Sequence, residues 1–283
     1  MRWTSGDRSN IEDLRGRSGG RAMGVGGLGV GGLLLLLVLS WVTGIDLTSI
    51  AGGGGGAPAP TETVGTGGSV KASPEEERLV DMVDAVMDDA QDTWRQLLGG
   101  RYQDTKVVLF RDAINSACGF AQAATGPFYC PADHKVYLDL GFFDEMQRKL
   151  GAPGDFAQAY VLAHELGHHV QTLTGTEAQV RQRQSADPGA RNALSVRMEL
   201  QADCFAGVWG YHANKGGTRV QLDPDDADEA LNAAAAIGDD RLQRMQSGRI
   251  APERFTHGTS QQRVEWFRRG MSSGDPNACN TFQ

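Results

Sequence analysis

The chain has 283 residues, of which 40% are hydrophobic, and it carries a formal net charge of −8 at pH 7. This length is enough for one sizeable globular domain together with accessory segments. The first 45 residues contain five arginines and three acidic residues, so the acidic excess lies in the rest of the chain. A chain with this excess of acidic residues is not expected to form the basic surface that nucleic-acid binding requires, so no nucleic-acid partner is expected.

The N-terminal part divides into two segments of different composition. Residues 1–21 are polar and show no helical periodicity, so we expect a disordered cytoplasmic segment. Residues 22–45 contain no charged side chain and include the aliphatic run Leu33–Leu39. A stretch of this length can span a bilayer core of about 30 Å. Because arginines flank its N-terminal side, the sequence predicts a single-pass cell-membrane protein with its N-terminus inside and its C-terminal domain outside.

A cleaved signal peptide is the main alternative for the apolar segment. No small-x-small cleavage site directly follows the apolar run, and the preceding polar region is long, so an uncleaved anchor is preferred. Residues 46–73 are rich in Gly, Pro and Thr and cannot bury much apolar surface. They are expected to form a flexible linker to a folded domain that covers residues 74–283.

The sequence predicts that the folded domain is mainly helical. Ser73 and Pro74 are typical of a helix start, and the apolar spacing that follows predicts a helix ending at Gly99. Two short β-branched segments, residues 106–111 and 136–140, predict strands. Residues 112–134 between them are expected to form a loop. Further helical patterns follow these strands (142–150, 155–174, 197–214, 225–237, 239–246 and a last helix capped by Thr259 or Ser260). This order predicts an α+β domain with few strands.

The motif His164-Glu165-x-x-His168 lies inside one of these helices. Residues four apart share a helix face, so His164 and His168 can bind one zinc ion. Glu165 is rotated by about 100°, which lets it act as a general base on water at that ion without becoming a ligand. Asp155, with Gln158, is expected to cap this helix. The alternative, two solvated histidines on an amphipathic helix, is disfavoured by the complete motif.

A catalytic zinc needs a third protein ligand. Glu199 and Asp203 are four residues apart on a later helix, so Glu199 can complete the site. Asp203 can then accept a hydrogen bond from a ligand histidine. An ordinary acidic helix face is the alternative for this pair. The remaining histidines are expected to be structural or solvated (His134, His169 and His212).

His257 precedes the last helix, and two interpretations of it remain open. Its ring could approach the metal and stabilise the oxyanion of a tetrahedral intermediate. A purely structural loop histidine fits the sequence equally well.

The chain contains four cysteines and no C-x-x-C pair, so thiolate zinc sites are not expected. Disulfides are permitted if the domain lies outside the cytoplasm. Of the three pairings, Cys118–Cys130 with Cys204–Cys279 is preferred, as a local loop closure and a tie from the C-terminal tail to the core. Four free thiols are the alternative.

Several segments resemble the bacterial putative neutral zinc metallopeptidase family, and the H-E-x-x-H plus E-x-x-x-D pattern resembles gluzincins. The resemblance covers roughly residues 75–283 and is carried by short blocks (117–119, 126–131, 136–140, 164–169, 199–204, 237–242 and 256–260). It implies a zincin-like domain with one zinc per chain and a peptide or protein substrate. It names no specific substrate or oligomeric state.

The sequence therefore favours a membrane-anchored zinc peptidase in which Glu165 activates water. Two other functions remain open at this point. One is a zinc-stabilised binding or chaperone-like module without turnover, which would need no general base. The other is a zinc amidase acting on cell-wall peptides.

Overall fold

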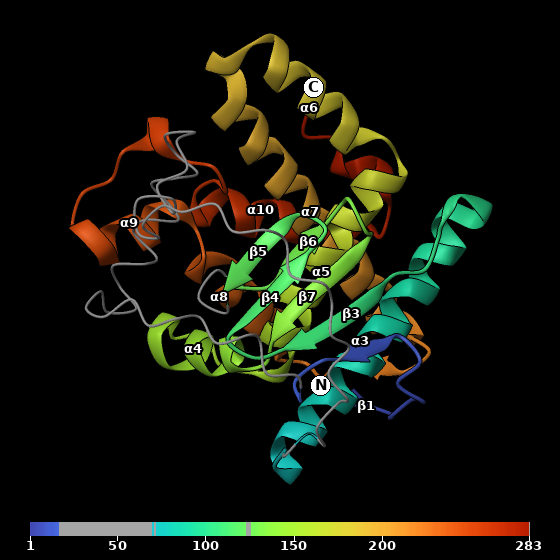
Figure 1. Ribbon diagram of the computed structural model, residues 1–283. Helices are drawn as coiled ribbons and strands as arrows, with labels where there is room; N and C mark the ends of the chain where they lie inside the picture. Colours follow the sequence, from blue (N-terminus) through green and yellow to red (C-terminus); the bar gives the residue numbers. More distant parts are fainter. Residues whose placement is uncertain (17–69, 71, 123–125, 283) are drawn as a thin grey trace, which may run out of the picture.

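A computed structural model describes residues 1–16, 70, 72–122 and 126–282 (Figure 1). The predicted membrane span, residues 22–45, lies outside these residues, as does nearly all of the predicted linker. In the part of the chain that the structure describes, no helix combines the length and the apolar character needed to cross a bilayer.

The first helix of the C-terminal part, α3 (Pro74–Leu98), begins and ends where the sequence predicts. The Ser73 hydroxyl accepts a hydrogen bond from the Glu76 N–H at 3.1 Å, which satisfies a donor that the first helical turn leaves open. The helix ends at Gly99, whose φ of 57° suits a residue without a side chain. Its apolar face enters the main core through buried side chains that include Met82, Val86 and Trp94.

The central sheet has four strands in the order β2 (Ile11–Asp13), β3 (Lys106–Phe110), β7 (Lys135–Asp139) and β6 (Phe128–Cys130). The first three strands are parallel to one another, and β6 is antiparallel to β7. The two predicted strands are therefore confirmed as β3 and β7. Among the described strands β6 pairs only with β7, so it forms one edge of the sheet.

The prediction of a plain loop over residues 112–134 is wrong. The segment contains the antiparallel hairpin β4 (Ala113–Ser116) and β5 (Gly119–Gln122), followed by β6. Strands of three or four residues are too short to show a clear alternation of polar and apolar side chains. Part of their order comes from a distant contact, since the Cys118–Cys130 disulfide joins the hairpin turn to the end of β6.

The helices pack around the sheet and on one another (Figure 1). They are α4 (Gly141–Leu150), α5 (Asp155–Leu173), α6 (Thr176–Ala186), α7 (Arg191–Gly216), α8 (Asp226–Ala236), α9 (Asp239–Ser247) and α10 (Ser260–Ser273). The motif helix α5 contacts α3, α7 and α8. The mainly helical α+β class is thus confirmed.

Helices α7 and α10 approach very closely, because glycines lie at their contact. A Cβ on Gly207 would come within 2.1 Å of the Phe267 carbonyl oxygen, and one on Gly270 within 1.9 Å of the Cys204 carbonyl oxygen. No other residue fits at either position. The close approach brings α10 side chains to the acidic residues of α7.

The predicted capping box of the motif helix is wrong. Gly154 is the N-cap with φ 115°, and Asp155 is already the first helical residue. The helix start is instead satisfied from another helix, since the Glu229 carboxylate of α8 accepts a hydrogen bond from the Phe156 N–H at 3.0 Å. A Cβ on Gly154 would lie 2.2 Å from that carboxylate, so the glycine makes room for it.

The prediction of disorder over residues 1–21 is wrong for residues 1–16, which we call the N-terminal segment. It forms β1 (Arg2–Trp3), which pairs with β8 (Val220–Gln221), and then β2, which pairs with β3. The segment carries no periodicity of its own, because its order depends on partners more than 60 residues away in the sequence. Both predicted disulfides, Cys118–Cys130 and Cys204–Cys279, are present.

Candidate metal centre

Helices α5 and α7 bring His164, His168 and Glu199 together. Nε2 of His164 lies 3.2 Å from Nε2 of His168 and 3.2 Å from Oε2 of Glu199. Nε2 of His168 lies 3.6 Å from Oε1 of Glu199. Two ligand atoms that are each about 2.0–2.1 Å from a tetrahedral zinc ion lie about 3.3–3.4 Å apart. The three side chains therefore have the spacing and the chemistry of a zinc site with one open position.

The non-ligating nitrogen of His164 is held by Asp203. Nδ1 lies 2.9 Å from Oδ1 of Asp203, which places the proton on Nδ1 and leaves Nε2 for a metal. Asp203 is fully buried and also accepts from the Tyr160 hydroxyl at 2.5 Å. Burial alone would raise the pKa of Asp203, but the Arg263 guanidinium and His164 outweigh it and hold that pKa below its ordinary value.

His168 is oriented through an amide rather than a carboxylate. Its Nδ1 lies 2.9 Å from Oε1 of Gln171, one helical turn further on. The Gln171 amide is itself fixed, since its Nε2 donates to the Met198 carbonyl at 2.7 Å and to Oε1 of Gln201 at 3.1 Å. Gln201 in turn donates to the Cys279 carbonyl at 3.0 Å. The Cys204–Cys279 disulfide fixes the C-terminal tail on α7. The tail can then accept the hydrogen bond from Gln201, which in turn orients Gln171 beside His168.

Glu165 lies beside the ligand triangle and is outside it. Glu165 is buried, with 8% of the residue's surface exposed. Burial raises the pKa of the Glu165 carboxyl, an effect that His164 and His168 partly offset. The nearby backbone of Tyr129 on β6 also opposes the rise in this pKa. A carboxylate with a raised pKa, held next to a metal site, has the properties of a general base.

His169 connects the motif helix to the edge strand. Its Nε2 lies 2.7 Å from the Gln103 carbonyl and its Nδ1 lies 3.0 Å from the Tyr129 hydroxyl. Nε2 must donate to the carbonyl, so Nδ1 accepts from the phenol. Burial lowers the pKa of His169, in agreement with a neutral ring. Tyr129 of β6 therefore contacts α5 through its side chain.

His257 interacts electrostatically with Glu199. Burial lowers the pKa of His257, but Glu199 and Asp239 outweigh burial and raise this pKa above its ordinary value. Oδ2 of Asp239 accepts hydrogen bonds from the backbone N–H groups of Thr256, His257 and Gly258 at 2.7, 2.7 and 3.1 Å. Oδ1 lies 3.2 Å from Nδ1 of His257. The loop and its ring are therefore anchored by one carboxylate, while the His257 side chain stays 41% exposed.

The other two histidines make structural contacts. His134 has a φ of 58° and its ring packs against that of His169. His212 lies 3.0 Å from the Gly274 carbonyl through Nε2. Neither belongs to the ligand triangle.

A second group of acids has metal-like spacing, formed by Asp155, Asp226 and Glu229. The amino group of Met1 lies between two of them, 3.1 Å from Asp155 and 3.0 Å from Asp226. Glu229 accepts from the Phe156 N–H. These carboxylates have partners without an ion, so the triangle on α5 and α7 is the better metal site.

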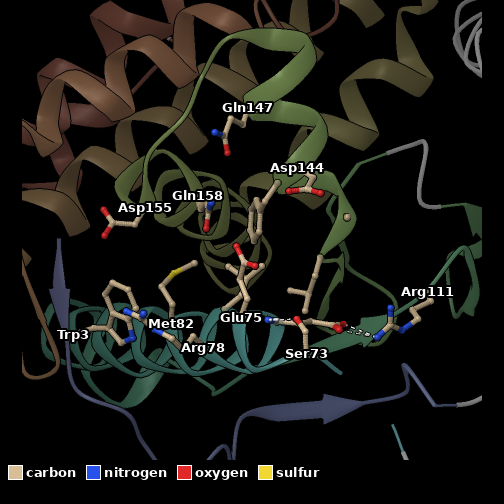
Figure 2. A pocket seen from close by; sticks show the side chains of 15 residues that line it. Trp3, Ser73, Glu75, Arg78, Met82, Arg111, Asp144, Gln147, Asp155 and Gln158 are labelled. Atoms are coloured by element: carbon tan, nitrogen blue, oxygen red, sulfur yellow. Dashed lines mark hydrogen bonds and ion pairs between the residues drawn. The ribbon is translucent and has the colours of Figure 1, made fainter. Parts of the chain in front are cut away.

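A large cavity of about 550 Å³ lies away from the metal centre. Figure 2 shows Trp3, Met82, Asp144 and Gln158 among its lining residues. None of the three triangle residues lines it, so the chemistry of the site does not take place there.

Sequence reasoning missed four of the residues that support the site. Arg263 and Asp239 carry no local signal, because each acts on a partner 18 or more residues away. Tyr160 and Gln171 do carry one. They lie four residues before His164 and three residues after His168, which puts them on the ligand face of the helix.

The chain matches a known protein family over nearly its whole length. The family model described as putative neutral zinc metallopeptidase matches residues 1–282. The chain is 50% identical to the uncharacterized protein YpfJ of Escherichia coli (strain K12) over 293 residues, covering 100% of this chain and 99% of that protein. It is 45% identical to the uncharacterized protein Rv2575 of Mycobacterium tuberculosis (strain ATCC 25618 / H37Rv) over 199 residues, covering 67% of this chain and 66% of that protein.

No solved structure is significantly similar to this chain. The family match spans nearly the whole sequence, the N-terminal segment included. With the ligand triangle and the adjacent glutamate in place, the chain belongs to the putative neutral zinc metallopeptidase family.

Proposed function

We propose that this chain is a zinc-dependent peptidase that hydrolyses peptide bonds. The observation that carries the proposal is the position of Glu165, a buried carboxylate next to the ligand triangle and outside it. A purely structural zinc site is closed by four protein ligands and needs no base. The described residues supply three ligands and one free carboxylate.

Zinc held by His164, His168 and Glu199 would polarise the scissile carbonyl and lower the pKa of a nearby water. Glu165 takes the proton from that water and transfers it to the leaving amine. Asp203 and Gln171 keep the proton of each ligand histidine on Nδ1. These residues hold the histidines in the form that binds metal throughout the reaction.

His257 is proposed to stabilise the oxyanion that develops on the carbonyl. Its ring is partly exposed and interacts electrostatically with Glu199, and Asp239 orients it through Nδ1. The raised pKa of His257 favours the charged ring, which is the form that stabilises negative charge best.

The zincin-like fold is part of this proposal and is supported by the edge strand β6. This strand contacts α5, and the Tyr129 hydroxyl on it lies 3.0 Å from Nδ1 of His169 in the motif helix. An extended peptide can add to such an edge by backbone hydrogen bonds, which would bring its scissile bond to Glu165.

The domain is proposed to act outside the cytoplasm. Two disulfides support this, because such bonds persist in oxidising compartments. Association of the apolar residues 22–45 with a membrane is proposed from their composition alone.

A mixed peptide library tests the activity. The purified full-length chain is stripped of metal, divided, and reloaded with one equivalent of zinc or left without metal. Mass spectrometry is then expected to find new cleavage products only in the zinc-loaded sample. A zinc-loaded, folded protein that cleaves no peptide bond would contradict the proposal and favour a binding module.

A further inference from the structure

The N-terminal segment contributes a strand to each of two sheets of the domain. β1 pairs with β8 through Arg2 opposite Gln221 and Trp3 opposite Val220. β2 pairs in parallel with β3, from Ile11 opposite Val107 to Asp13 opposite Leu109. Without β2, the described part of the chain would leave β3 as an open sheet edge. The segment thus completes the fold of the domain.

Two arginines of the segment bind the acidic face of α3. The side chain of Arg15 is only 1% exposed and lies 3.0 Å from Glu76 and 2.9 Å from Glu77. Arg8 lies 2.6 Å from Glu77 and donates through Nε to Asp81 at 2.8 Å. A buried guanidinium is tolerated only when it is paired. The positive charges of the segment therefore pair with negative charges on α3. Removing the segment or the helix would take these partners away from the charges of the other.

The fit is also steric. A Cβ on Gly6 would lie 2.3 Å from Oδ2 of Asp84 and 3.0 Å from Oδ2 of Asp88, so the backbone of the segment touches α3 directly. Asn10 donates to Asp88 at 2.7 Å. Trp3 forms part of the cavity wall together with Met82 of α3 (Figure 2). The segment therefore contacts α3 through its backbone as well as through its side chains.

The contacts of Arg15 place the end of the segment beside the first turn of α3. Residues 16 and 72 therefore both lie near the start of α3. Because β2 of the segment pairs with β3 of the domain, the two backbones lie about 4.8 Å apart. A single crossing of a bilayer would instead put residues 1–16 and α3 on opposite sides of a core about 30 Å thick.

We infer that residues 1–16 fold together with residues 72–122 and 126–282 in one compartment, on the same side of any membrane. This arrangement differs from the one expected from the arginine flank, in which the N-terminus alone is inside. The inference does not depend on the proposed peptidase activity. It also holds whichever compartment the domain occupies.

Thiol labelling in cells tests the inference. Ser5→Cys reports on the N-terminal segment and Ala178→Cys on α6, and both residues are exposed. Each is made in the full-length chain and treated in intact spheroplasts with a membrane-impermeant maleimide. The parent chain is the control, because its four cysteines are paired in disulfides. The two variants should behave alike, both labelled before lysis or both only after it. Labelling of one variant before lysis and of the other only after it would overturn the inference.

Hydrogen exchange of the purified full-length wild type gives a second test that needs no variant. The Leu14 N–H donates to the Leu109 carbonyl at 2.8 Å, and the Val107 N–H to the Asn10 carbonyl at 2.9 Å. Both amides should exchange at least 100-fold more slowly than in an unstructured peptide. Exchange of Leu14 at the unstructured rate would show that the segment is not docked. Protection on both sides of the β2–β3 pair supports the docked state.

Discussion

Arg263 and Asp203 form a buried ion pair at the contact between α10 and α7. Nε of Arg263 lies 2.9 Å from Oδ2 and Nη2 lies 2.8 Å from Oδ1, and the two side chains are 2% and 0% exposed. Oδ1 of Asp203 also holds Nδ1 of His164. The last long helix of the chain is therefore linked to a metal ligand through one carboxylate.

Replacing Arg263 by Ala should lower the free energy of unfolding by about 3–5 kcal/mol, because it leaves the Asp203 charge buried without its partner. Urea denaturation measures the change. Arg148→Ala is the matched control, since Arg148 pairs with Asp144 on the surface and both side chains are 71% exposed. That exposed pair is expected to contribute at most about 1 kcal/mol. Equal losses in the two variants would contradict the assigned role of Arg263.

Gln171→Leu should weaken zinc binding without unfolding the chain. The substitution removes the acceptor that holds Nδ1 of His168 at 2.9 Å. Loss of such an outer partner typically reduces metal affinity about 10–100-fold. Competition with a chromogenic chelator measures the affinity, with the exposed Gln147→Leu as control. An unchanged affinity in Gln171→Leu would show that His168 does not rely on this amide.

Glu199→Ala should remove the third ligand and most of the bound zinc. Glu199 lies 3.2 Å from His164 and 3.6 Å from His168, on a different helix from both. Metal content after dialysis, measured by atomic emission, is expected to fall far below one zinc per chain. A variant that retains one zinc with wild-type affinity would exclude Glu199 as a ligand.

Asp239 should stabilise the fold in a pH-dependent way. Burial opposes its ionisation, but the bonds from His257 and the loop N–H groups hold the folded-state pKa below the ordinary value of about 3.9. A depressed pKa contributes stability above the unfolded-state pKa, and this contribution is lost as pH falls through the folded-state pKa.

Asp239→Asn is therefore expected to be less stable than wild type at pH 7, by about 1–3 kcal/mol for bonds to a charged acceptor. The difference should shrink as the pH falls below about 4. Thermal unfolding between pH 3 and pH 7 measures this trend. A stability difference that stays constant over the whole range would rule out the charge of Asp239 as its origin.

The parts of the fold that depend on neighbouring residues could be predicted from the sequence. Helix α3 begins at the predicted cap because Ser73 binds Glu76 three residues away. The two histidines of the motif and the pair Glu199 and Asp203 have fixed spacing on regular helices, so their common faces follow from helix geometry. The pairing of the cysteines followed from the small number of alternatives.

The features that depend on distant partners could not be predicted. The cap of α5 comes from Glu229 on α8, and the order of the N-terminal segment comes from Glu76 and Glu77 on α3. The sequence does not distinguish Arg263 from a surface arginine on a polar helix. Its role follows only from the packing of α10 against α7, which brings it to Asp203. In each case the sequence contains the residue but does not contain the contact that gives it a role.

If Glu165 is the general base of a zinc peptidase, removing its basicity should greatly reduce hydrolysis and leave the zinc in place. Glu165→Gln keeps the size of the side chain and removes its basicity. Zinc content, thermal stability and peptide cleavage are measured together on the wild type and the variant. We expect one zinc per chain and an unchanged melting temperature in the variant, with hydrolysis reduced by about 10²–10⁴-fold. A folded, zinc-loaded Glu165→Gln protein that cleaves peptides at the wild-type rate would contradict this role of Glu165.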